Sequence, residues 1–151
     1  MTDLHLHRIL KAPRKLVWDC WTQPELLKPW FCPKPHFVTE AEIDLRPGGR
    51  FFTLMSVNGA LYPNDGALLE VTPMDRLVFT DLLLSDYRPV ANPGLGFTAI
   101  LTLKDHPEGT DYTVLARHRT AEDAAKHEAM GFHGGWNTAA DQLEAFAATL
   151  A

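Results

Sequence analysis

The chain has 151 residues, of which 46% are hydrophobic and 22% charged, and its formal net charge is −5. This length suits a single domain over residues 1–151, and an acidic balance without a cluster of lysines and arginines argues against a nucleic-acid partner. Charged and histidine residues interrupt the first apolar residues, so these form neither a secretory signal nor a membrane span, and we expect a cytoplasmic protein with no membrane partner and two reduced cysteines.

The first elements are a strand and two short helices. Residues 4–11 alternate between apolar and polar side chains, which predicts a strand. Ala12-Pro13 opens a short helix, because proline is tolerated in a first turn where its missing N–H has no partner to lose. A second short helix is predicted over residues 22–30, with Pro24 in its first turn.

A hairpin follows, and it is the clearest signal in the sequence. Residues 37–45 and 51–57 both alternate with period two, and Arg46-Pro47-Gly48-Gly49 lies between them. Proline sets the φ angle of the second position of a type II turn, and glycine supplies the positive φ of the third. The pattern predicts two antiparallel strands joined at Gly48.

The remaining strands are separated by turn and loop signals. Asn58-Gly59 predicts a turn, and residues 63–66 predict a loop. Residues 85–96 form the longest irregular stretch. Further strands are predicted over residues 67–71, 76–84, 97–103 and 112–118.

The C-terminal part of the chain is helical from residue 121 onward. Thr120 is a suitable N-cap, and Trp136, Leu143 and Phe146 fall on one apolar face. Glycines around Gly131 predict a kink or short break. Because this face is too apolar to stand alone, we expect the concave side of the sheet to receive the helix.

Together these elements resemble the family of homologues of the activator of the 90-kDa heat-shock protein ATPase, within the START or Bet v 1-like (SRPBCC, helix-grip) superfamily. The resemblance implies an α+β helix-grip fold, in which a curved antiparallel sheet of about seven strands wraps around a long C-terminal helix and two short helices lie between the first two strands. It covers nearly the whole chain and is carried by Ala12-Pro13, Val17-Trp18, Thr22, Pro24, Glu25, Trp30, residues 44–49, Gly66, Pro73, residues 76–80, Gly135-Trp136 and Leu143.

The sequence carries no signature of an activated nucleophile, a phosphate-binding loop or a metal site. Neither serine lies in a Gly-x-Ser-x-Gly setting, and no Cys-x-x-Cys or His-Glu-x-x-His pattern occurs. We therefore expect no cofactor and no metal, and the catalytic residues, if there are any, are unknown.

Asp81 and Arg117 are the candidate polar groups of an interior site. Asp81 follows Leu77 and Phe79 in phase, and Arg117 follows Leu115 in phase, so both could face the inside of the sheet. A buried carboxylate must be paired or protonated. Two interpretations remain open: a structural ion pair near the rim of the sheet, or polar groups that orient a ligand in an apolar cavity.

A cavity between the sheet and the C-terminal helix would have several further lining candidates. The tryptophans could line it, although we expect at least two of the four to fill the core instead. Loop 85–96 and the break near Gly131 are the expected gates. The ligand-cavity candidates are Trp18, Trp30, Phe79, Asp81, Arg117, His133 and Trp136.

Three classes of function fit these features. The first is a binding or carrier domain for a small, largely apolar molecule, because nothing supplies an activated nucleophile. The second is a cyclase- or hydrolase-like enzyme that uses the same cavity, with Asp81, His118 or His133 as acid or base. The third is a chaperone-interacting module like the ATPase activator, which is less favoured because the chain has no room for the additional domain with which the eukaryotic co-chaperone engages its chaperone. Whether the chain forms a homodimer is left open.

Overall fold

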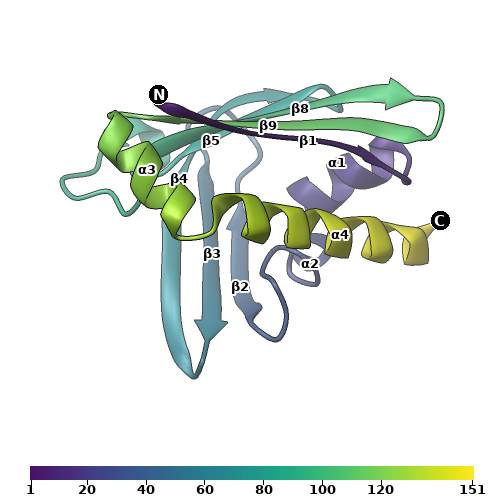
Figure 1. The fold of residues 1–151 in the computed structure, drawn as a ribbon, viewed down its shortest axis with the longest axis horizontal. Helices are drawn as coiled ribbons and strands as arrows, with labels where there is room; N and C mark the ends of the chain where they lie inside the picture. Colours follow the sequence, from purple (N-terminus) through teal and green to yellow (C-terminus); the bar gives the residue numbers. More distant parts are fainter.

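A computed structural model describes all residues from 1 to 151 as a seven-stranded antiparallel sheet curved around a long helix (Figure 1). The sheet has the order β1-β9-β8-β5-β4-β3-β2. This is the helix-grip fold that the sequence predicted. The strands of the sheet are β1 (Asp3–Leu10), β2 (Phe37–Ile43), β3 (Arg50–Val57), β4 (Ala60–Thr72), β5 (Arg76–Thr80), β8 (Phe97–His106) and β9 (Gly109–His118).

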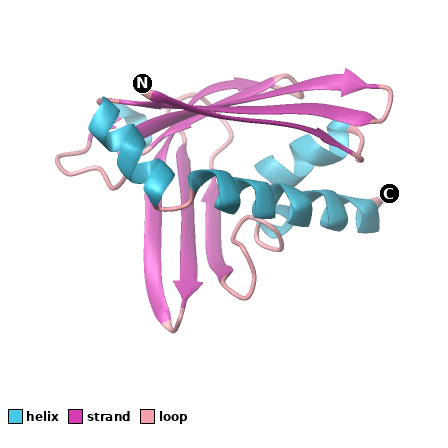
Figure 2. Ribbon diagram, viewed as in Figure 1, coloured by secondary structure: helices cyan, strands magenta, loops and turns pink.

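The helices lie along the inner side of this curved sheet. Figure 2 shows the C-terminal helix crossing the concave face, with two short helices beside its C-terminal half and another helix beyond its N-terminal end. No helix is both long enough and apolar enough to span a membrane. The helices are α1 (Arg14–Thr22), α2 (Pro24–Leu27), α3 (Ala121–Ala129) and α4 (Phe132–Leu150).

The turn between β2 and β3 has the geometry that its sequence predicted. Gly48 has φ +82°, and the Gly49 amide donates to the Arg46 carbonyl over 2.9 Å, which are the features of a type II turn. A Cβ atom at Gly48 would lie 2.7 Å from the ring of Tyr87, so glycine is required both for the backbone and for the space.

The ends of the helices also follow local sequence signals. The Thr120 hydroxyl accepts from the Asp123 amide over 3.1 Å and caps α3. Gly131, at φ +99°, separates α3 from α4, so the predicted break is confirmed.

α1 begins directly after Pro13, whereas the second short helix is limited to Pro24–Leu27 and is shorter than the predicted 22–30.

The predicted loop at residues 63–66 is wrong, because these residues belong to the continuous strand β4. β5 pairs only with the part of β4 from Ala67 onward, so the first half of β4 has a free edge where the missing N–H of Pro63 costs no ladder hydrogen bond. Gly66 is needed where the two strands meet, since a Cβ there would lie 2.1 Å from the Thr80 carbonyl oxygen.

The predicted strand over residues 76–84 is also too long. β5 ends at Thr80, and the chain then bends and forms a small separate hairpin. The first strand of this hairpin lies before the predicted irregular stretch 85–96, and its second strand lies within that stretch. This hairpin consists of β6 (Leu83–Leu84), a 3₁₀ helix (Ser85–Tyr87) and β7 (Arg88–Pro89). Residues 90–96 then form the loop that leads into β8.

The core is an aromatic cluster centred on Trp21 of α1, which is fully buried. Its ring lies 5.2 Å from that of Trp30 and 5.8 Å from that of Phe79, measured between centroids. Its indole N–H donates to the hydroxyl of buried Tyr112 over 3.2 Å. α1 and the segment that follows α2 therefore pack their aromatic side chains between the sheet and α4, where such side chains bury the most apolar area.

Candidate ligand-binding pocket

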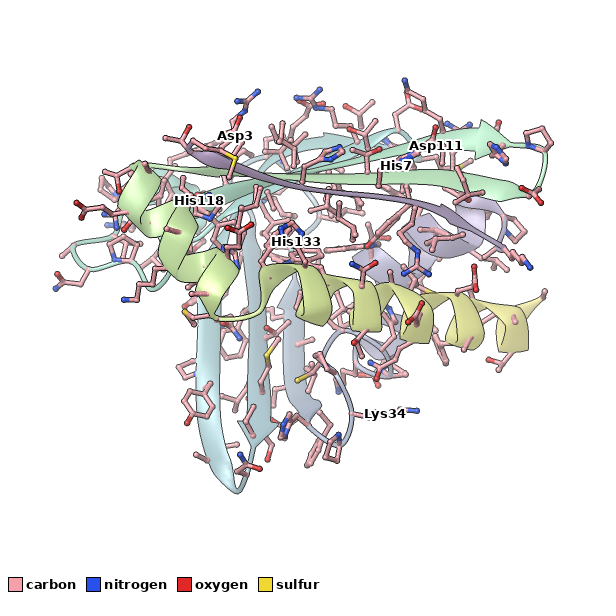
Figure 3. The ribbon with its side chains drawn as sticks, viewed as in Figure 1. Asp3, His7, Lys34, Asp111, His118 and His133 are labelled. Carbon is pink, nitrogen blue, oxygen red and sulfur yellow. The ribbon has the colours of Figure 1, made fainter.

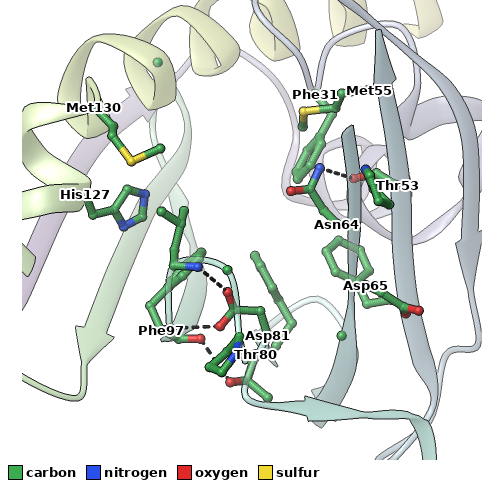
Figure 4. Close-up of a pocket in the computed structure, with 18 of the residues that line it drawn as sticks. Phe31, Thr53, Met55, Asn64, Asp65, Thr80, Asp81, Phe97, His127 and Met130 are labelled. Carbon is green, nitrogen blue, oxygen red and sulfur yellow. Dashed lines mark hydrogen bonds between the residues drawn. The ribbon is translucent and has the colours of Figure 1, made fainter. Parts of the chain in front are cut away.

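A pocket of about 500 Å³ lies beside this core, between the sheet and the junction of α3 and α4. Figure 4 shows His127 and Met130 on one side of it and Thr53, Met55 and Asn64 on the other. The pocket is partly open to solvent, and aromatic side chains supply much of its wall. These aromatic residues are Trp30, Phe31, Phe51, Phe79, Phe97, Phe132 and Trp136.

Two periodicities in the sequence bring these walls together. Along β3, Phe51, Thr53 and Met55 alternate toward the pocket, as the period of two requires. Along α4, residues at positions 132, 135, 136 and 139 recur at helical spacing and form the opposite wall. The pocket is thus a direct consequence of packing an amphipathic helix across a curved sheet.

Most polar groups in the wall already have partners within the protein. The Asn64 amide donates to the Thr53 hydroxyl over 3.4 Å, and the Thr80 hydroxyl donates to the Phe97 carbonyl over 3.0 Å. Arg50 binds the Asp65 carboxylate through two hydrogen bonds of 3.0 Å. Groups engaged in this way shape the wall and have little left to offer a reacting substrate.

Asp81 lines the pocket, but its carboxylate serves the loop before β8. It accepts from the backbone amides of Leu95 over 2.9 Å, Gly96 over 3.1 Å and Phe97 over 2.9 Å (Figure 4). The Asp81 amide also donates to the Phe97 carbonyl over 3.3 Å, so backbone and side chain of Asp81 both bind the start of β8 directly after β5 ends. The side chain holds the pocket wall in place.

The predicted pairing of Asp81 with Arg117 is wrong. Arg117 is 58% exposed and binds Asp3 of β1 over 2.9 Å (Asp3 is labelled in Figure 3). On β9 every second position from Thr110 to His118 is buried, so the phase shared by Leu115 and Arg117 belongs to the outer face. Arg117 lies outside the pocket and forms a surface ion pair there.

The other candidates divide between the pocket, the core and the surface. Trp30, Phe79 and Trp136 line the pocket together with Asp81. Trp18 is buried in the core and is not part of the pocket wall. His133, labelled in Figure 3, lies at the start of α4, is half exposed and binds Glu128 over 3.1 Å. It is not one of the residues that line the pocket.

A buried pair of histidines closes one end of the pocket, and the sequence identified only one of them. His118 at the end of β9 lies 2.8 Å from His127 of α3, measured from Nε2 to Nδ1, and His127 lines the pocket. Burial, reinforced by the adjacent His118 and partly opposed by Asp81, lowers the pKa of His127 to about 4. His127 could have been suspected from its spacing to buried Ala124 on α3, but helix spacing does not reveal a partner on a strand.

No group of three or more histidine, cysteine or acidic side chains is placed to hold a metal ion. Cys20 and Cys32 are both free and buried. Burial, together with the charge of Asp19, raises the pKa of the Cys20 thiol to about 11, so this side chain is an inert part of the core.

The role of Asp81 as an anchor leads to a stability prediction. In Asp81→Asn, one amide oxygen replaces two carboxylate oxygens, so at least one buried backbone N–H loses its acceptor. We expect the unfolding free energy to fall by about 1–3 kcal/mol and the amides of residues 95–97 to exchange faster with solvent. Denaturant unfolding and hydrogen exchange measure both effects. Asp105→Asn, at an 80% exposed side chain, is the control and should change stability by less than about 0.5 kcal/mol. Unchanged protection of these amides would show that Asp81 does not hold the loop.

Comparisons with known proteins agree with this architecture. The sequence model of the family described as "Activator of Hsp90 ATPase homolog 1-like protein" matches residues 11–148. The structure of protein NE0264 from Nitrosomonas europaea is similar over 99% of this chain and 96% of that one, with 44% identity and a TM-score of 0.95. Protein Ms6760 from Mycobacterium smegmatis is similar over 95% and 89% of the two chains, with 26% identity and a TM-score of 0.80. No curated protein matched the sequence.

Proposed function

The chain belongs to the family of activator of Hsp90 ATPase homolog 1-like proteins, and within it we propose that this protein is a binding or carrier domain for a small, largely apolar molecule. The START/Bet v 1-like fold often binds hydrophobic ligands, which supports this proposal. The observation that carries it is the aromatic pocket between the sheet and α4, at about 500 Å³ within the usual size range of ligand sites.

The composition of the pocket wall supports an apolar ligand. Rings from three strands and from α4 face the same space, and burial of apolar surface contributes about 25 cal/mol per Å². The polar groups in the wall are few, and most of them already bind other groups of the protein. A ligand would therefore gain its affinity from apolar contact and its orientation from one or two polar groups.

The same wall favours binding over catalysis. A general acid–base pair would need a histidine oriented by a carboxylate, or two carboxylates with separated pKa values. Here His127 is paired with a second histidine, and Asp81 is occupied by three backbone amides. A lowered pKa near 4 also makes His127 a weak base at neutral pH.

Two segments of the wall are suited to admit the ligand. Val90, Pro93 and Leu95 of the loop before β8 line the pocket; this loop belongs to no strand and is held by the Leu82 carbonyl at Val90 and by Asp81 at Leu95. Gly131 lines it at the left-handed break between α3 and α4, beside Met130, which is 64% exposed. Movement at either segment would open the pocket without unpairing the sheet.

Two neighbouring glycines of α4 provide a matched test. A Cβ atom at Gly134 or at Gly135 would meet nothing within 4 Å, but only Gly135 lines the pocket. The new side chain of Gly135→Leu should fill the pocket, and that of Gly134→Leu should point elsewhere. Both variants should gain a similar helix propensity, somewhat less than the roughly 0.8–1 kcal/mol that separates glycine from alanine.

We expect the neutral apolar dye N-phenyl-1-naphthylamine to bind the wild-type protein, with a rise in its fluorescence. Gly135→Leu should weaken this binding by at least about tenfold, since a leucine side chain removes the space and the contact area of the ligand. Gly134→Leu should bind like the wild type. Equal binding by all three proteins would place the dye outside the pocket and contradict the proposal.

A further inference from the structure

The contacts of the two histidines at the end of the pocket determine which ring nitrogens carry a proton. The ring of His118 contacts a backbone carbonyl through one nitrogen and His127 through the other. His118 Nδ1 lies 2.9 Å from the carbonyl oxygen of Thr2, which can only accept a hydrogen bond. In a neutral ring, Nδ1 of His118 therefore carries the proton and Nε2 is an acceptor.

The tautomer of His118 determines the tautomer of His127. Because His118 Nε2 accepts, His127 Nδ1 must carry the proton that it donates across 2.8 Å. The remaining nitrogen of His127, Nε2, is then unprotonated and presents a lone pair. The chain of hydrogen bonds from His127 through His118 to the Thr2 carbonyl thus leaves one free acceptor, Nε2 of His127.

That acceptor has no partner within the protein, and it opens toward the pocket. His127 is only 6% exposed and lines the pocket, but none of the hydrogen bonds of the protein involves its Nε2 atom. Arg14 Nε, elsewhere in the protein, is the one side-chain nitrogen or oxygen that is both fully enclosed and without a hydrogen bond. Because His127 Nε2 also lacks a hydrogen bond, it is not fully enclosed and is therefore accessible. Figure 4 shows the imidazole of His127 at the edge of the pocket, near Met130.

Apolar rings surround this acceptor on the protein side. The ring of Phe97 lies 4.8 Å from that of His127, and the ring of Phe132 lies 5.1 Å from it. The titratable groups that act on His127 are His118 and the carboxylate of Asp81. A ligand carboxylate would meet a lone pair and a nearby negative charge, whereas a hydroxyl or N–H group would find an acceptor in apolar surroundings, where a hydrogen bond is strong.

We propose that His127 Nε2 is the polar recognition point of the pocket, and that the ligand is an apolar molecule carrying a hydrogen-bond donor, such as a phenol or an alcohol, in preference to a carboxylate. This inference rests on the proposed binding function and specifies the chemistry of the ligand. His118 is a positioning residue, because it sets the proton on His127 without reaching the ligand.

Protonation would reverse this preference. If the pair gains one proton on either ring, His127 Nε2 carries a hydrogen in both arrangements, since the hydrogen bond between the rings still needs one donor and one acceptor. The acceptor at the pocket becomes a donor. Binding of a donor ligand should therefore weaken in acid while the pocket stays in place.

Two probes of the same carbon framework, one with a hydroxyl donor and one with that donor methylated, test the proposal directly. 4-Propylphenol has a hydroxyl group, and 4-propylanisole has a methyl ether in its place. In NMR titrations at neutral pH we expect the phenol to bind the wild-type protein about fivefold more tightly, as one net hydrogen bond allows. This preference should vanish in His127→Phe and persist in His133→Phe, which makes the same change at a half-exposed histidine outside the pocket.

The possible outcomes separate this inference from the proposed function. Equal affinity of the two probes at the pocket of the wild-type protein would overturn the inference and leave the binding function standing. Absence of binding by both probes would contradict the proposed function and the inference with it. The ring ¹⁵N resonances of the ligand-free wild-type protein need no variant: an unprotonated His127 Nε2 near pH 7 is expected, and a protonated one would overturn the inference even if His127→Phe fails to fold.

Discussion

Replacement of Trp21 by alanine is expected to lower the unfolding free energy by about 3–5 kcal/mol, the range for truncation of a core aromatic side chain. Trp21 is fully buried and contacts five other aromatic rings. Its removal also leaves the hydroxyl of buried Tyr112 without its indole donor. Denaturant unfolding of the variant measures this loss.

Trp136→Ala is the matched comparison for this prediction. The side chain of Trp136 is only partly buried, packs against the edge of the core and lines the pocket. Its truncation enlarges an existing space and creates no new enclosed cavity, so the loss should be clearly smaller than for Trp21. Equal losses in the two variants would mean that the core is not centred on Trp21.

The histidine pair should make stability depend on pH. An unfolded histidine has a pKa of about 6.5, whereas burial, followed by the influence of His118, lowers the pKa of His127 to about 4 in the folded protein. Between these values the unfolded chain binds a proton that the folded protein excludes, so the unfolding free energy falls as the pH falls. The loss should accumulate from pH 6.5 to pH 4 and reach about 3 kcal/mol, with no contribution above this range.

His127→Phe isolates this contribution from that of the carboxylates, which also titrate in acid. The quantity to measure is the difference in unfolding free energy between wild type and variant at a series of pH values. This difference should change by about 3 kcal/mol between pH 6.5 and pH 4. A difference that stays flat over this range would show that the folded protein binds this proton readily.

The parts of the fold that the sequence predicted correctly depend on local chemistry. The turn at Gly48, the cap at Thr120 and the break at Gly131 each follow from the conformational range of one or two residues. The strand alternation and the apolar face of the C-terminal helix then leave few ways to bury the apolar surface. The local sequence around Pro63 predicts a loop, because a proline is tolerated in β4 only where the strand has a free edge, and no local pattern reveals that edge.

The site was predicted less well, because it depends on contacts between distant segments. Asp81 was placed at the interior correctly, but its partners are backbone amides 14 to 16 residues later in the chain, which have no sequence signature. Arg117 was assigned to the inner face by counting from Leu115, which lies on the outer one. His127 becomes meaningful only when α3 brings it against His118 of β9.

A crystal structure of the protein with 4-propylphenol tests the central claim most directly. We expect electron density for the phenol between Phe79 and Trp136, with the hydroxyl oxygen within about 3 Å of His127 Nε2, the length of an O–H···N hydrogen bond. A pocket that contains only water while the phenol binds elsewhere would contradict the claim that this pocket is the ligand site.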